Sequence, residues 1–172
     1  MPNNEFKDIN VLIDRVTLLS YKINEEYILN REKKNVVQSI SQRTRFNILQ
    51  EIAAFEIDFN YIDQSTNEQF LSITVLSQFK LPGLLAIQQL DDKGKLLDKA
   101  NVPRPLLVTC FSISVTQTRT LLTQLIATSK LSRKVPFSII DPALVANKMY
   151  PPEAGDLYEL DVTKIDKGKE VI

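Results

Sequence analysis

The sequence predicts an α+β fold in which a four-stranded antiparallel sheet is followed by a long and a short C-terminal helix on one face of the sheet. Two observations carry this prediction. Segments in which apolar and polar residues alternate fill the first half of the chain, and residues 54–62 are the clearest of them. Apolar or small residues at three-and-four spacing then occupy residues 107–126, where they mark one face of a helix.

The first two strands are predicted at residues 11–23 and 36–48. The two faces of the first, VLIDRVTLLSYKI, are expected to be Leu12, Val16 and Leu18 on one side and Ile13, Arg15 and Thr17 on the other. The second, VVQSISQRTRFNI, alternates weakly, which leaves its pairing register open by one residue.

The next two strands form the best-defined part of the predicted sheet. In AFEIDFNYI, apolar side chains at Phe55, Ile57, Phe59 and Tyr61 share one face, while polar side chains share the other. A short polar turn leads to FLSITVLSQFKLPG, which alternates in the same way. We therefore expect an antiparallel hairpin with one packed face and one solvated face.

The second half of the chain predicts two helices joined to the sheet by a loop. Pro82 and Gly83 end the fourth strand, and residues 91–105 are expected to form a loop. The long helix begins near Pro105, where the first turn tolerates proline, and runs to about residue 130. Asp141 and Pro142 supply the capping oxygen and the first residue of the short helix.

The length of 172 residues and the hydrophobic content of 44% suit one domain with one core. We expect that domain to span residues 1–152, and the charge-dense residues 153–172 to form a flexible tail. The sequence shows neither a membrane-spanning apolar run nor a secretory signal, and the single cysteine, Cys110, fits a reducing compartment. The expected location is the cytoplasm.

The composition argues against most catalytic and nucleic-acid-binding functions. Twenty-one basic and 21 acidic residues give zero net charge, which is unsuited to neutralising phosphates, so nucleic acid is not an expected partner. Histidine is absent, which removes imidazole metal sites and histidine-activated nucleophiles. Cys110 is expected to be a buried structural thiol rather than a nucleophile. We expect a protein that is not an enzyme and uses no cofactor or metal.

The order of elements and several motifs resemble the SecB family of export chaperones over roughly residues 11–150. The most specific motifs are the long helix with Arg119 in TQTRTLLTQLIATSK, the extended link VPFSII, and the closing helix DPALVANKMY. KLPGLLAI, in which a glycine after the fourth strand precedes an aliphatic run, is a second point of similarity.

The resemblance implies an ATP-independent chaperone, a holdase that binds extended, non-native polypeptide in an apolar groove. It also implies a homotetramer built as a dimer of dimers, with the first strands and the long helices at its interfaces. The clients would be export substrates or one dedicated protein such as an antitoxin. Zero net charge favours client binding over docking to the export motor SecA. The alternative is a non-catalytic oligomeric adaptor that binds one folded partner.

Two sets of site residues follow from these expectations. Client binding is assigned to apolar residues of the connection after the first strand, the run after the fourth strand, and the closing helix with its preceding link. They are Tyr27, Ile28, Leu29, Leu84, Leu85, Ile87, Ile139, Ile140, Val145 and Met149. For Tyr27, Ile28 and Leu29 the alternative is that they cap the core. Glu56 and Asp58, on the polar face of the third strand, are expected to be solvated side chains or an acidic docking surface rather than a catalytic acid and base.

Overall fold

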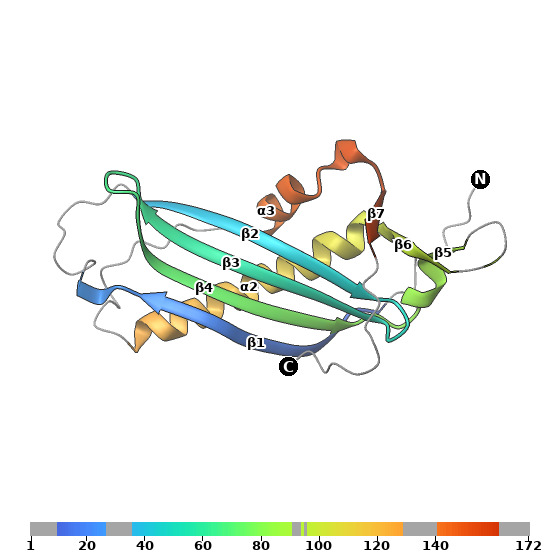
Figure 1. Cartoon of the computed structure of the whole chain (residues 1–172), viewed down its shortest axis with the longest axis horizontal. Coiled ribbons are helices and arrows are strands. Elements are labelled where there is room, and N and C mark those ends of the chain that lie inside the picture. The colour runs from blue at the N-terminus through green and yellow to red at the C-terminus, as the bar shows by residue number, and fades with distance from the viewer. Residues whose placement is uncertain (1–9, 27–35, 91–93, 95, 129–140, 162–172) are drawn as a thin grey trace.

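The computed structural model describes residues 10–26, 36–90, 94, 96–128 and 141–161. Its main sheet confirms the predicted four antiparallel strands (Figure 1). The strands are β1 (Leu12–Ile23), β2 (Val36–Asn47), β3 (Ile52–Asp63) and β4 (Glu68–Lys80). Their order across the sheet is β1-β4-β3-β2, so β1 and β2 are its two edges.

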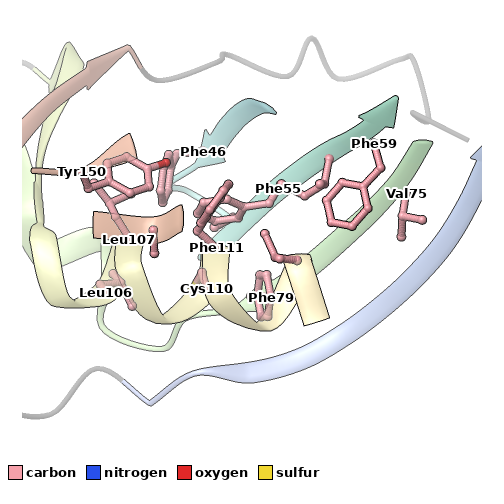
Figure 2. Packing of buried hydrophobic residues seen from close by; sticks show 14 of the residues in the cluster. Phe46, Phe55, Phe59, Val75, Phe79, Leu106, Leu107, Cys110, Phe111 and Tyr150 are labelled. Carbon is pink, nitrogen blue, oxygen red and sulfur yellow. The ribbon is translucent and has the colours of Figure 1, made fainter. Parts of the chain in front are cut away.

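One face of the sheet forms the core, as the alternation in β3 and β4 predicts. Phe55, Ile57 and Phe59 are fully buried on β3, and Val75 and Phe79 are fully buried on β4 (Figure 2). The rings of Phe55 and Phe79 meet edge to face, with their centroids 5.8 Å apart and their planes at 82°. The alternate residues of both strands lie on the opposite face, which is partly open to solvent.

Helix α2 (Arg104–Ala127) packs on β3 and β4 over this apolar face. Its buried stripe includes Leu107, Phe111 and Leu122, together with the small residues Ser114 and Thr118. The two hydroxyls donate to the carbonyl oxygens of Cys110 and Ser114, one turn earlier, at 2.8 Å. Because their polar atoms are satisfied within the helix, these small residues let the helix lie close to the sheet.

Helix α3 (Pro142–Met149) confirms the predicted cap and packs against α2. The Asp141 side chain accepts a hydrogen bond from the amide of Ala143 at 2.9 Å. After the helix, the Tyr150 carbonyl accepts from Arg104 Nε at 2.8 Å, and the Gln42 amide donates to the Tyr150 hydroxyl at 2.9 Å. These contacts hold α3 between the start of α2 and strand β2.

A second sheet corrects two predictions. The 3₁₀ helix η2 (Leu84–Ile87) leads into β5 (Gln88–Leu90) and β6 (Leu96–Pro103), and β6 occupies about half of the predicted loop at residues 91–105. The predicted tail instead contains the 3₁₀ helix η3 (Pro152–Ala154) and β7 (Leu157–Asp161), and the sheet order is β5-β6-β7. Residues 157–161 of the predicted tail therefore pair with β6, and residues 162–172 lie outside the described part of the chain.

Aromatic contacts and backbone hydrogen bonds hold β7 in place. The Tyr158 ring packs edge to face on Tyr150, with centroids 5.5 Å apart, and its hydroxyl donates to the Pro151 carbonyl at 2.8 Å. The Arg104 amide donates to the Asp156 carbonyl at 2.8 Å. The alternation in LYELD, residues 157–161, extends over only five residues and is therefore a weak strand signal. The charged residues around it favoured the prediction of a flexible tail instead. Among the described helices, none is both long and apolar enough to cross a bilayer.

Candidate functional site

The ten residues assigned to client binding do not form one described surface. Five of them, Tyr27, Ile28, Leu29, Ile139 and Ile140, lie outside the described residues. The other five belong to η2 and α3, which lie in different parts of the molecule: η2 beside the second sheet and α3 beside β2 (Figure 1).

Burial separates these five residues further. Leu84 is fully buried and Ile87 is 7% exposed, so both belong to the core and neither is open to a client. Leu85, between them, is 50% exposed, because a 3₁₀ turn directs it away from its two neighbours. On α3, Val145 and Met149 are half-buried against the core. The short helix buries Ala146 instead, and Leu144 is 62% exposed.

Glu56 and Asp58 lie on the solvated face of β3, as the alternation predicts. Glu56 Oε1 is 3.1 Å from the guanidinium of Arg43 on β2. Asp58 accepts hydrogen bonds from Thr74 at 2.7 Å and from Ser41 at 3.2 Å. Both carboxylates thus bond across strands to side chains of the same face, which is the arrangement of a solvated sheet surface.

Cys110 is a buried thiol of the core. Its side chain has no exposed surface, and it lies between α2 and the sheet (Figure 2). Burial raises the pKa of the thiol to about 12, so it stays protonated over the whole physiological range. A thiol in that state is a poor nucleophile, which agrees with a structural role.

Among the described residues, β1 carries more exposed large apolar side chains than any other element does. Five of its large apolar side chains are exposed: Leu12 at 53%, Ile13 at 54%, Val16 at 38%, Leu19 at 45% and Tyr21 at 57%. We call these five residues the β1 surface. Exposed apolar side chains gathered on one element mark interaction sites more often than scattered ones do.

Two shifts in the pairing of β1 with β4 determine which side chains of β1 point to each face of the sheet. The pairing with β4 shifts between Ile13 and Arg15 and again between Leu18 and Ser20, which leaves Asp14 and Leu19 as extra residues. Ile13, Val16 and Tyr21 consequently pair with Phe79, Ser77 and Ile73, whose side chains point to the helix side of the sheet. Simple alternation put Ile13 and Val16 on opposite faces, and that prediction was wrong because it did not include the shifts.

Helix α2 borders the helix-side part of the β1 surface. Ser77 on β4 lies beside Val16, and its hydroxyl donates to Gln117 Oε1 of α2 at 2.7 Å. Ile113 and Leu121, one turn before and one turn after Gln117, lie on the same flank of the helix and are half-buried. Apart from Arg104 and Arg119, α2 has no charged residue, so this flank is uncharged.

The opposite edge of the sheet is different. The outward residues of β2 are polar or charged after Val37, and the exposed ones are Ser39, Ser41, Arg43 and Arg45. Charged and polar side chains on an edge strand disfavour pairing with another chain. Of the two edges of the main sheet, as far as the structure describes them, the β1 edge combines an open ladder with an apolar surface and the β2 edge does not.

This arrangement suits contact with another polypeptide. Among the described residues, no group of three or more histidine, cysteine, aspartate or glutamate side chains could hold a metal ion. The β1 surface offers apolar area and a strand edge, two features that in other proteins bind extended polypeptides through side-chain burial and main-chain hydrogen bonds. The chain matched neither any model of a known protein family nor any curated protein with which it was compared.

Proposed function

We propose that this protein is an ATP-independent holdase with a SecB-like fold, and that it binds non-native polypeptide at the β1 surface. The observation that carries the proposal is the exposure of five large apolar side chains on one edge strand. A cytosolic protein with such a surface gains free energy by covering it with apolar segments of another chain, at about 25 cal/mol per Å². Client selectivity is low, because burial of apolar area depends little on sequence.

The residues assigned from the sequence contribute less than expected. Leu85 remains a candidate contact because half of its surface is exposed, and Val145 and Met149 offer only part of theirs. We place the principal contacts on Ile13, Val16 and Tyr21 instead, because these side chains are exposed beside the uncharged flank of α2.

Aggregation of a chemically unfolded reporter protein tests the proposal. At equimolar amounts and without nucleotide, the protein should suppress light scattering by the reporter. The variant Ile13→Asp/Tyr21→Asp should lose this activity, because charge on the β1 surface disfavours apolar contact. The matched control Leu144→Asp, which changes an equally exposed residue on α3, should retain it. An absence of suppression by the parent at several-fold excess would refute the holdase proposal.

The second candidate function is an adaptor that binds one folded partner through the same surface. It predicts one stoichiometric complex with a native protein and no effect on unfolded reporters. The aggregation assay therefore separates the two functions directly, since only a holdase acts on several unrelated unfolded proteins.

A further inference from the structure

We propose that the solvated face of the main sheet carries a separate binding site, in which Arg15 and Arg45 hold an extended acidic segment of a partner protein. The site is one row of side chains across the four strands, at the end of the sheet near the β2–β3 turn. Its members pair in turn from β2 to β1, and they are Arg45, Ala54, Gln78 and Arg15. We call these four residues the arginine row.

The two arginines supply the free charge at this end of the face. Both residues are exposed, and within the described part of the chain neither guanidinium has a carboxylate at ion-pair distance. The neighbouring carboxylates already have cations of their own. Glu56 lies 3.1 Å from Arg43, and Asp14 lies 3.4 Å from Lys80. The free charge is therefore positive, whereas the docking surface considered from the sequence was acidic.

A shift in the pairing of β1 directs Arg15 to this face. Ile13 points to the helix side, so strict alternation would direct Arg15 to the helix side as well. The extra residue Asp14 moves Arg15 to the solvated face, opposite Gln78. Bulges of this kind re-aim side chains and are frequent next to functional sites. The same shift therefore completes the arginine row and supplies the carboxylate that pairs with Lys80.

The spacing of the two arginines fits an extended segment that crosses the strands. Arg15 and Arg45 belong to the two edge strands of the sheet (Figure 1). Three strand spacings of about 4.8 Å separate their backbones, which gives about 14 Å. In an extended chain, side chains four residues apart point to the same side and lie about 14 Å apart. Two carboxylates at that spacing can each meet one guanidinium, whose planar fork binds a carboxylate through two hydrogen bonds.

The middle of the row leaves room for the chain between the two carboxylates. Ala54 projects only a methyl group, and Gln78 carries a neutral amide that can donate a hydrogen bond to a main-chain carbonyl. A residue midway between the carboxylates would lie over Ala54, where a small side chain fits best. The arginine row is therefore suited to a segment with two acidic residues four positions apart and a small residue between them.

A nucleic acid strand fits this face less well than such a segment does. Glu56 and Asp58 lie on the same face, one and two rows away from the arginine row. A strand of phosphates would carry negative charge past both carboxylates, and like charges brought together in this way oppose binding. A peptide with two carboxylates confines its charge to the arginine row.

Titration of capped peptides into the full chain tests the site. A peptide containing Asp-Gly-Ser-Gly-Asp should bind at low salt, and its Asn-Gly-Ser-Gly-Asn analogue should not. The affinity should fall about threefold in Arg15→Gln or Arg45→Gln and about tenfold in the double variant. Lys22→Gln is the matched control, because Lys22 is an exposed cation on the same face, about 20 Å along β1. It should change the affinity by less than about 1.5-fold.

Three results would overturn the proposal. They are an unchanged affinity of the double variant, an equal loss in Lys22→Gln, and tighter binding of a short single-stranded oligonucleotide than of the acidic peptide. The site is also separable from client binding, because Ile13, Val16 and Tyr21 point to the other face of the sheet. The double variant should therefore still suppress aggregation of the unfolded reporter, and a loss of suppression would contradict a separate site. A parent that binds the peptide without suppressing aggregation would refute the holdase proposal and leave this site intact.

Discussion

Replacing Ile13 and Tyr21 by serine measures how much the β1 surface contributes to client binding. Ile13 is 54% exposed and Tyr21 is 57% exposed, so a client can cover about half of each side chain. Burying a whole large apolar side chain is worth about 1.5–3 kcal/mol. Each serine should therefore weaken client binding by about 1 kcal/mol, or about fivefold, and the double variant by about thirtyfold.

Serine removes the apolar area without adding charge, and the exposed position limits the cost to folding. Affinity for a fluorescent, permanently unfolded reporter can be measured by anisotropy, with the mass of the protein checked by light scattering in the same buffer. Leu144→Ser is the matched control, because Leu144 is 62% exposed but belongs to α3. It should change the affinity by less than about twofold.

Two results would refute the reasoning. If Ile13→Ser/Tyr21→Ser binds the reporter as tightly as the parent does, the β1 surface is not the client site. If Leu144→Ser weakens binding as much as the double variant, then exposed apolar residues contribute wherever they lie, and β1 has no special role. A loss of affinity accompanied by a change in mass would show that the serines disturb the assembly of the protein rather than its contact with the client.

Three further predictions concern the core and its caps. Asp141→Ala should lower the free energy of unfolding in urea by about 1 kcal/mol, because the amide of Ala143 loses its acceptor. Phe111→Ala should lower it by about 3–5 kcal/mol, whereas Thr109→Ala, on the exposed side of the same helix, should change it by less than about 0.5 kcal/mol. Iodoacetamide at pH 9 should label Cys110 only in urea, because the thiol is buried in the folded protein. The free energy of unfolding should fall as the pH rises from about 9 towards 12, because the thiol of the unfolded chain loses a proton that the thiol of the folded chain keeps. Rapid labelling of the native protein, or stability that rises over that pH range, would contradict the last prediction.

Local patterns predicted most of the main sheet and both helices. Alternation in β3 and β4 was strong because one face is fully buried, and Asp141 followed by proline marked the start of α3. The stripe on α2 was correct in position, and its serines and threonines are compatible with a helix because their hydroxyls bond to carbonyls one turn earlier.

The parts that failed depend on contacts between distant residues. Pairing of β6 with β7 joins residues 99–103 to 157–161, and no local pattern in either segment marks that contact. The two shifts in β1 move the side chains that follow each shift to the opposite face from the one that simple alternation predicts. These shifts arise in the pairing with β4, and the sequence of β1 alone does not mark them. Candidate residues were therefore assigned to segments that include η2 and α3, while no client-binding residue was assigned to the first strand, which was expected at an interface between subunits.

The position of β7 also affects how the chain folds during translation. Lys99 of β6 and its partner Glu159 of β7 are separated by 60 residues. At about 5–20 residues per second, the ribosome adds that stretch in about 3–12 s. During this interval β6 has no neighbour on its β7 side, although all four strands of the main sheet have already been made. Stalled or truncated products that end before Leu157 therefore expose the eight-residue strand β6 as a sheet edge in place of the five-residue strand β7, and they should be more prone to aggregation than the finished chain.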